Sequence, residues 1–381
     1  MQWSSAPTLM QRLESSLSVL DRVLPRRRRT GRTYQGFIKA LLGRSASIQQ
    51  LLAPRLRTLT QSAAGSRWRI GRFVPIGADG SKFDAPRTIA NEALGLAGKD
   101  KCGPQMMLLL LVHLGCMIPW SSRVGRADEP ERSLLRSALD DLPEDTLLVA
   151  DAGFTGFDFL SELLRRKVHF LVRVGRGIHL LKQLGCYRRE GKDTVYLWPS
   201  YRDGKAPLTL RLFRIGSIYL ITSVTDPREL SRRAAGELYR RRWGLEVSFR
   251  ALKQTLERRK VRSCQAERAK EELLWSVIAL WILTLMGMRT LKRAGLDPHR
   301  LSIAGALAAI RHAAHSSASL SGLRRRMCRA VMDQYLRRAG KTAYRWPHKK
   351  NPKPPGAPRL TVATRLQVAR AQALLRSIDG R

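Results

Sequence analysis

Short apolar runs in the middle of the chain, separated by segments of helical pattern, constrain the fold most. The runs "MMLLLLVHLGCMI" (Met106 to Ile118), "TLLVAD" (Thr146 to Asp151) and "HFLVRV" (His169 to Val174) have the length of buried strands. The segments "EPERSLLRSALDDL" and "GFDFLSELLRRK" place apolar residues at helical spacing. The longer segment "QMMLLLLVHLGCMIPWSSRV" (Gln105 to Val124), which contains the first run, is predicted to form two strands that meet near Gly115. We therefore expect an α/β fold with a sheet of mixed direction.

The regions on either side of these runs have different patterns. Residues 1–65 show helical spacing, whereas 177–224 contains hairpin-like runs such as "PLTLRLFRI" and "IYLITSV". We interpret the latter as a β-rich insertion before a helix that begins at Asp226 and Pro227. The predicted divisions are an N-terminal helical, DNA-binding region (1–65), a core (66–262, with the insertion at 177–224), a C-terminal helical region (263–345) and a Pro-rich basic arm and tail (346–381).

Two of the predicted strands end at an aspartate. Asp151 follows an apolar run, and Asp79 stands at the end of "RWRIGRFVPIGADG", which predicts a strand that closes in an Asp-Gly turn. A carboxylate beside a buried strand is costly unless it is paired or coordinated. Each residue also has a structural explanation: Asp79 as a turn former and Asp151 as the cap of the following helix.

A third acid lies in "LYRRRWGLEVSFRALKQ" (Leu238 to Gln254). On a helix of about 100° per residue, Tyr239, Arg242, Glu246 and Lys253 share one narrow stripe. A surface ladder of salt bridges would explain part of this pattern. The aspartates favour a site, because three carboxylates at a sheet edge suit a hard divalent cation. Such a set supports two-metal phosphoryl transfer.

Charge indicates the partner. The chain has 70 Lys and Arg against 30 Asp and Glu, a net charge of +40. A basic surface gains free energy by displacing counterions from phosphates, so we expect a nucleic acid. The alternative is a generally basic, solvated surface. The block "PRRRRTGRTY" (Pro25 to Tyr34) concentrates the charge and is predicted to grip phosphates rather than form an ordinary loop.

Neither long apolar run predicts a membrane span. The runs Met106 to Ile118 and Leu273 to Met288 are shorter than the ~20 residues that a bilayer requires, so we expect both in the core. The five cysteines form no CxxC pair, and the N-terminus lacks the pattern of a signal peptide. These features predict a cytoplasmic, nucleoid-associated protein.

The spacing of the helical residues also supports a family resemblance. Tyr239, Arg242, Glu246 and Lys253 read Y-x2-R-x3-E-x6-K, and in this the chain resembles the DDE transposases of the insertion-sequence-four family. The segment "ADAGFTGFDFLSELL" is similar to that family's second-aspartate segment, and "GADGSKFDAPRTIANE" to its first. The resemblance runs from about residue 73 to 262.

The resemblance implies a fold and a chemistry. It implies a ribonuclease-H-like core with a β-rich insertion, and Mg²⁺ or Mn²⁺ held by Asp79, Asp151 and Glu246. Asp84 competes with Asp79 as the first acid. The implied substrate is double-stranded DNA, both transposon ends and target. The implied activity is cut-and-paste transposition by a homodimer on the terminal inverted repeats.

The resemblance also suggests roles for polar and aromatic neighbours. Tyr239, Arg242 and Lys253 would grip phosphates beside the scissile bond. Some relatives pass through a hairpin, which requires a base stacked on an aromatic. Trp198 and Trp243 are the candidates, with ordinary packing as the alternative. Two other functions stay open: a non-transposing ribonuclease-H-like nuclease or resolvase, and a catalytically decayed DNA-binding protein.

Overall fold

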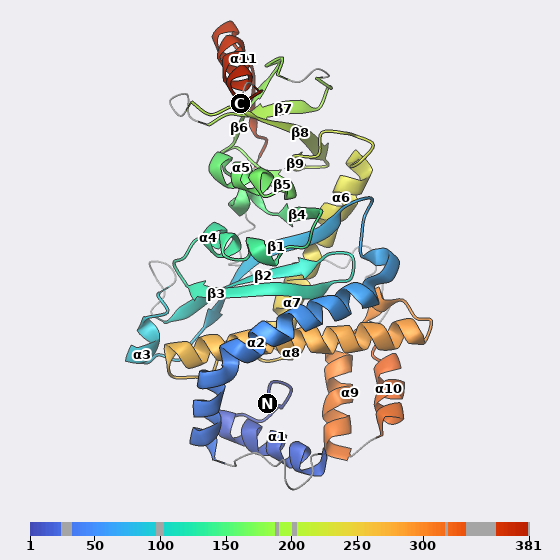
Figure 1. Cartoon of the computed structure of the whole chain (residues 1–381). Helices are drawn as coiled ribbons and strands as arrows, with labels where there is room; N and C mark the ends of the chain where they lie inside the picture. The colour runs from blue at the N-terminus through green and yellow to red at the C-terminus, as the bar shows by residue number, and fades with distance from the viewer. Residues whose placement is uncertain are drawn as a thin grey trace, which may run out of the picture. The chain divides into compact units, whose positions relative to one another are not determined.

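The computed structural model describes residues 1–23, 33–96, 103–186, 190–199, 204–316, 319–332 and 356–379. The fold is mixed α/β, as predicted (Figure 1). The chain divides into two compact units. Unit 1 comprises Met1–Ile70, Ile76–Leu142 and Arg242–Met332, and unit 2 comprises Gly71–Pro75, Pro143–Arg241 and Asp333–Arg381. The four divisions expected from the sequence stay predictions, as does the ribonuclease-H-like arrangement.

Three antiparallel strands form the sheet of unit 1: β1 (Val74–Asp84), β2 (Gln105–His113) and β3 (Ile118–Arg126). Every residue of β2 is buried, because this strand is paired on both edges and is apolar from Met106 to Val112. The predicted division of the first apolar run near Gly115 is confirmed. A Cβ at Gly115 would lie 2.1 Å from the Arg67 carbonyl oxygen, so only glycine fits this connection.

The predicted Asp-Gly turn at the end of the first strand is wrong. β1 continues through Asp79 and Gly80 to Asp84, and it pairs with β2 from Ile76 opposite His113 to Asp84 opposite Gln105. The pairing with β2 overrides the local turn preference of the Asp-Gly dipeptide. Asp79 therefore lies inside a strand rather than at its end.

Long helices cover the sheet of unit 1. α2 (Tyr34–Ala64) begins after Thr33, whose side chain accepts a hydrogen bond from the Gly36 amide. α8 (Ala266–Arg293) contains the apolar run Leu273 to Met288, which we expected in the core, and it packs against α2 and β3. Among the described helices, α8 alone is long and apolar enough to cross a membrane, and 67% of its apolar window is buried inside the protein. The helices of unit 1 are α1 (Leu9–Val23), α2 (Tyr34–Ala64), α3 (Ile89–Glu92), α4 (Glu131–Arg136), α7 (Trp243–Arg250), α8 (Ala266–Arg293), α9 (Ile303–Ser316) and α10 (Leu320–Cys328).

Unit 2 is built on the parallel pair β4 (Thr146–Ala150) and β5 (His169–Val174), which α5 (Phe157–Arg165) connects. The predicted β-rich stretch extends this sheet beyond β5 in the order β9, β8, β7 and β6, and β10 from the tail pairs with β6. These strands are β9 (Ile218–Thr222), β8 (Leu208–Ile215), β7 (Thr194–Leu197), β6 (His179–Lys182) and β10 (Arg359–Val362).

Two details of unit 2 differ from the sequence interpretation. α6 (Arg232–Arg241) does not begin at Asp226, because that carboxylate organises a preceding turn by accepting from the Arg228 amide at 2.8 Å. The tail also contains β10 and α11 (Arg365–Asp379), which the sequence did not predict. α11 packs Ala371 against Leu181, Leu184 and Tyr196. The basic block before Tyr34 and the Pro-rich arm fall largely outside the described residues.

Candidate active site

The segment with the Y-R-E-K spacing is not the single regular helix that we predicted. α6 ends at Arg241 and α7 begins at Trp243, so Arg242 lies between two helices. α7 then passes into a π-helical turn at Ala251–Thr255, which contains Lys253. A π turn closes i to i+5 hydrogen bonds, and Lys253 therefore departs from a rotation of about 100° per residue. Tyr239 belongs to unit 2, and the other three residues belong to unit 1.

In unit 1, α7 packs across one face of β1. A Cβ at Gly77 would lie 2.8 Å from Leu245 Cδ1, so strand and helix approach closely there. Farther along, the rings of Phe83 and Phe249 lie 6.4 Å apart. Alternate residues of a strand share a face, which places Asp79, Ser81 and Phe83 on the same side as Gly77. This packing brings α7 over the carboxylate of Asp79.

Arg242 connects two of the predicted acids. Its Nη1 lies 3.3 Å from Asp79 Oδ2, and its Nη2 lies 3.9 Å from Glu246 Oε1. The Arg242 side chain is 12% exposed, against 21% for Asp79 and 39% for Glu246. One guanidinium thus lies between two carboxylates, and the two carboxylates remain accessible at the surface of the unit.

Lys253 lies on the same face of β1. Its Nζ donates a hydrogen bond of 2.7 Å to Ser81 Oγ and lies 4.8 Å from the centroid of the Phe83 ring. Sequence reasoning missed Ser81. The signal was the two-residue period from Asp79, which becomes visible only once the strand is known to continue past the Asp-Gly pair.

Asp84, the competing first acid, faces the other way. Asp84 follows Asp79 by five positions, an odd number, so the two side chains lie on opposite faces of β1. Its carboxylate accepts a hydrogen bond from Gln105, its partner on β2. Its backbone pairs with Arg259 and Val261. Asp84 therefore connects β1 to β2 and to the segment after the π turn.

In unit 2, Asp151 follows β4 directly, as predicted. Its Oδ1 accepts a hydrogen bond of 2.7 Å from the Ala152 amide and one of 3.3 Å from the Tyr239 hydroxyl. Arg173 Nη1 lies 3.7 Å from the same oxygen. Asp151 is thus both the cap of a 3-10 turn and the partner of Tyr239. Sequence reasoning missed Arg173, whose signal was a lone arginine in the apolar run of β5.

The structure collects the predicted site residues in two groups. In unit 1, Arg242 joins Asp79 and Glu246, and Lys253 contacts Ser81 on the same strand face. In unit 2, Tyr239 and Asp151 are hydrogen-bonded. Within the described ranges, no three His, Cys, Asp or Glu side chains lie close enough together to hold a metal ion. The oxygen donors of Asp79 and Glu246 nevertheless have the chemistry that Mg²⁺ requires.

Residues 78–282, more than half of the chain, match the sequence model of the family described as "Transposase DDE domain". The chain belongs to this transposase family. The resemblance that the Y-R-E-K spacing indicated is thereby confirmed, and all six predicted site residues fall within the matched region.

Two individual proteins that this transposase family member resembles share only a low sequence identity with it. "Transposase InsG for insertion sequence element IS4" of Escherichia coli strain K12 is 25% identical over 249 residues, which cover 59% of this chain and 54% of that protein. The chain thus spans about half the length of this curated relative. A solved piggyBac transposase synaptic complex with hairpin DNA aligns at 11% identity and a TM-score of 0.38, over 71% of this chain and 60% of that chain.

The two candidate tryptophans of this transposase family member differ in exposure. Trp198, after β7, packs against the cluster that includes Tyr196 and Ala371. Trp243, the first residue of α7, is 57% exposed. Trp198 therefore has a packing role in unit 2, whereas the ring of Trp243 is open to solvent.

Proposed function

We propose that the protein is the transposase of an insertion sequence, which binds terminal inverted repeats and catalyses metal-dependent cleavage and strand transfer of DNA. The observation that carries the proposal is the placement of Arg242 against Asp79 and Glu246, within the region that matches the transposase family. Ribonuclease-H-like topology and cut-and-paste movement are part of the same proposal.

Asp79, Asp151 and Glu246 would hold Mg²⁺ or Mn²⁺. When bound, such ions activate a water or a 3′-hydroxyl and stabilise the leaving oxygen. The side chains of the protein contribute the oxygen donors and partly neutralise their charge, since Arg242 contacts Asp79 and Glu246, and Arg173 contacts Asp151. The opposite orientation of Asp84 supports Asp79 as the first acid.

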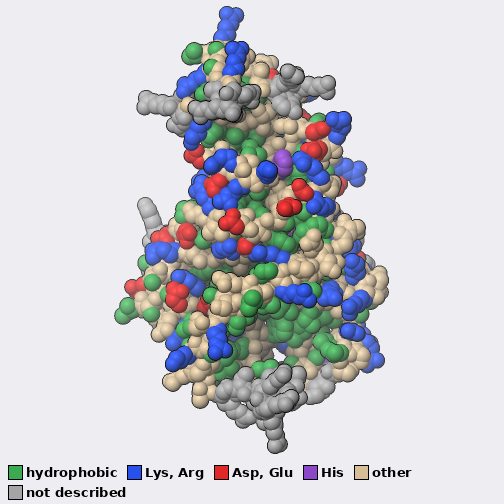
Figure 2. Space-filling view, in the orientation of Figure 1, with side chains coloured by type: hydrophobic (Ala, Val, Ile, Leu, Met, Phe, Trp, Pro, Cys, Tyr) green, Lys and Arg blue, Asp and Glu red, His purple; other side chains and the backbone are tan. Residues whose placement is uncertain are grey.

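Phosphates of the DNA would be gripped by Arg242, Lys253 and Tyr239. Arg242 offers a bidentate fork, and Lys253 offers a point charge. The surface supports a DNA partner, because Lys and Arg side chains are spread over the face that Figure 2 shows. Two transposon ends must be cut together, so the proposal includes a homodimer on the DNA, acting in the cytoplasm at the nucleoid.

The proposal is tested with a plasmid that carries the gene together with its flanking DNA. A transposase excises the segment between two inverted repeats in the presence of Mg²⁺ and inserts it elsewhere with a short target duplication. A nuclease or resolvase of the same core would cut or recombine without insertion, and a decayed transposase would bind without cutting. Either of the last two results would overturn the proposed function.

A further inference from the structure

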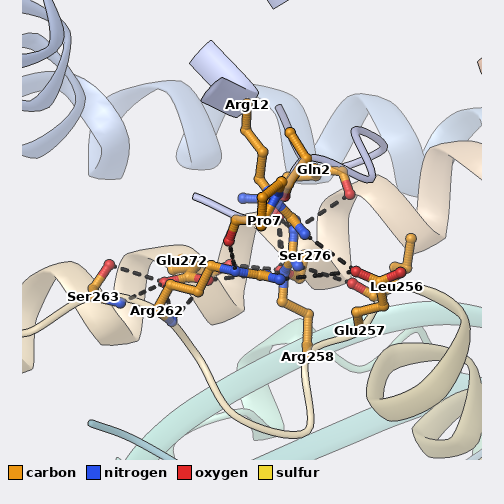
Figure 3. Close-up of polar contacts among 11 residues, drawn as sticks. Gln2, Pro7, Arg12, Leu256, Glu257, Arg258, Arg262, Ser263, Glu272 and Ser276 are labelled. Carbon is orange, nitrogen blue, oxygen red and sulfur yellow. Dashed lines mark hydrogen bonds and ion pairs between the residues drawn. The ribbon is translucent and has the colours of Figure 1, made fainter. Parts of the chain in front are cut away.

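A buried polar network lies directly after the turn that carries Lys253 (Figure 3). It comes from three segments of unit 1: the start of the chain, the segment that follows the π turn of Lys253, and α8. Pro7 and Leu256 contribute backbone carbonyl oxygens, which accept from Arg262 and Arg258. The labelled residues are Gln2, Pro7, Arg12, Leu256, Glu257, Arg258, Arg262, Ser263, Glu272 and Ser276. The Arg12 and Arg258 side chains are each only 1% exposed, so neither reaches a DNA molecule outside the protein.

Arg258 is satisfied largely by the start of the chain. Its Nη2 donates to Gln2 Oε1 at 2.8 Å, and its Nε donates to Ser276 Oγ at 3.0 Å. Glu272 Oε1 lies 4.0 Å from the same Nε, and burial lowers the pKa of Arg258 to about 10. A buried guanidinium without acceptors is strongly unfavourable. Gln2 thus supplies acceptors for the buried Arg258 guanidinium, together with Ser276 and the Leu256 carbonyl oxygen.

Glu257 is held in an unfavourable backbone conformation. Its φ is +58°, in the left-handed region that glycine adopts with least strain. Its carboxylate lies 3.3 Å from Arg12 Nη2 and 3.8 Å from Arg262 Nη2. Arg12 is itself fixed, because its Nε donates to the Ala6 carbonyl at 2.7 Å. The first residues of the chain thus hold the side chain of a strained residue.

The two residues directly after Glu257 close the π turn of Lys253. The Arg258 amide donates to the Leu252 carbonyl at 2.9 Å, and the Arg259 amide donates to the Lys253 carbonyl at 3.2 Å. The backbone of Lys253 is therefore hydrogen-bonded directly to the segment that Gln2 and Arg12 hold. A shift of Glu257 and Arg258 would move Lys253 relative to Ser81, which lies on the separate strand β1.

We infer that the segment Gln2–Arg12 positions Lys253: through Glu257 and Arg258 it fixes the π turn that holds the Lys253 ammonium over β1. Lys253 touches the phosphate, whereas Gln2, Arg12, Glu257 and Arg258 are positioning residues. The inference rests on the proposed phosphate contact of Lys253. It couples the start of the chain to the Y-R-E-K segment without requiring that segment Gln2–Arg12 contact DNA.

Glu257→Gln tests the inference, because charge and positioning predict opposite results. Removing an acid from a DNA-binding protein strengthens binding and steepens its salt dependence if charge alone matters. If Glu257 positions Lys253, the phosphate contact is lost, and the slope of log affinity against log salt flattens by about one. The matched control is Glu267→Gln, which removes an exposed acid paired with Lys270 on α8. We expect this control to keep or steepen the slope.

The measurement is repeated in a Lys253→Ala background, with a duplex taken from the DNA that flanks the gene. We expect Lys253→Ala to flatten the slope by about one, and Glu257→Gln to add nothing in that background. An independent slope change from Glu257→Gln, or an unchanged slope in the single variant, would overturn the inference. An unchanged slope for Lys253→Ala alone would instead overturn the proposed phosphate contact.

A second variant separates positioning from folding. Glu257→Gly accepts the positive φ without strain and therefore keeps the backbone of the turn, but it removes the contact with Arg12. We expect Glu257→Gly to fold, to unfold at a lower temperature than wild type because the buried Arg12 loses its carboxylate partner, and still to flatten the salt slope. A wild-type slope in a folded Glu257→Gly variant would show that the residue only shapes the turn, and would contradict the inference.

Discussion

At the residue scale, the two aspartates of β1 have different predicted roles: Asp79 a functional one and Asp84 a structural one. Asp79 shares its face with Arg242 and Ser81, whereas Asp84 accepts a hydrogen bond from Gln105 on the other face. We expect Asp79→Asn to abolish Mg²⁺-dependent cleavage while DNA binding persists. Asp84→Asn should keep cleavage and lower the free energy of unfolding by about 1 kcal/mol. Cleavage assays and chemical denaturation of both variants check this, and loss of cleavage only in Asp84→Asn would reverse the assignment.

A second residue-scale prediction concerns His113, which is fully buried at the end of β2. Its ring stacks on Trp68 at 4.6 Å, and its Nε2 lies 2.9 Å from the Trp68 carbonyl oxygen. Burial lowers the pKa of His113 to about 4. The unfolded chain binds a proton near pH 6.5 that the folded chain does not bind until about pH 4. Neutral His113 therefore makes its full contribution to the free energy of unfolding above pH 6.5. This contribution, up to about 3 kcal/mol, is lost as the pH drops toward 4.

Denaturation at a series of pH values measures this dependence. In His113→Gln, the free energy of unfolding should fall much less between pH 6.5 and 4 than in wild type. In the control His312→Gln, at an exposed position on α9, it should fall as in wild type. The same pH dependence in His113→Gln as in wild type would show that other groups cause it.

At the element scale, the close packing of α7 against β1 determines where Arg242 and Glu246 lie. A Cβ at Gly77 would approach Leu114 Cδ2 to 2.7 Å and Leu245 Cδ1 to 2.8 Å, and both leucines are fully buried. We expect Gly77→Ala to displace α7, to lower the free energy of unfolding by about 1–3 kcal/mol and to weaken metal-dependent cleavage.

The control for Gly77→Ala is on the same strand. Gly80 faces the other side of β1, where a Cβ would meet only the carboxylate end of the Glu131 side chain, at 2.6 Å. That side chain can move, so Gly80→Ala should retain cleavage and most of the stability. Thermal unfolding and cleavage are compared for the two variants. Equal unfolding temperatures and equal cleavage in Gly77→Ala and Gly80→Ala would contradict close packing of α7 against β1 at Gly77.

The elements that periodicity predicts correctly are those whose local pattern agrees with their tertiary environment. β2, β4, β5 and α5 are examples, since buried runs and helical spacing depend on the chain itself. The end of β1 could not be predicted this way, because its pairing with β2 overrides the Asp-Gly turn signal. The break at Arg242 and the π turn at Lys253 likewise depend on packing against β1 and on the network at Arg258.

At the scale of the whole molecule, the predicted site residues come from distant parts of the chain. The sequence predicted the acids individually, and the structure places Asp79 with Glu246 around Arg242 in unit 1 and Asp151 with Tyr239 in unit 2. Ser81, Arg173 and Glu257 were missed because their partners come from other segments, and a single sequence carries no record of such pairings. The net charge of +40 predicted the class of partner without indicating any contact.

In the proposed function, Glu246 takes part in metal-dependent phosphoryl transfer on DNA. This role is tested by comparing Glu246→Gln with Glu237→Gln, which removes an exposed acid of α6 paired with Arg233. Both variants are given Mg²⁺ and DNA that carries the gene's flanking sequence. We predict that wild type and Glu237→Gln cleave this DNA, and that Glu246→Gln binds it with unchanged or higher affinity but does not cleave. Normal cleavage by Glu246→Gln would contradict this role.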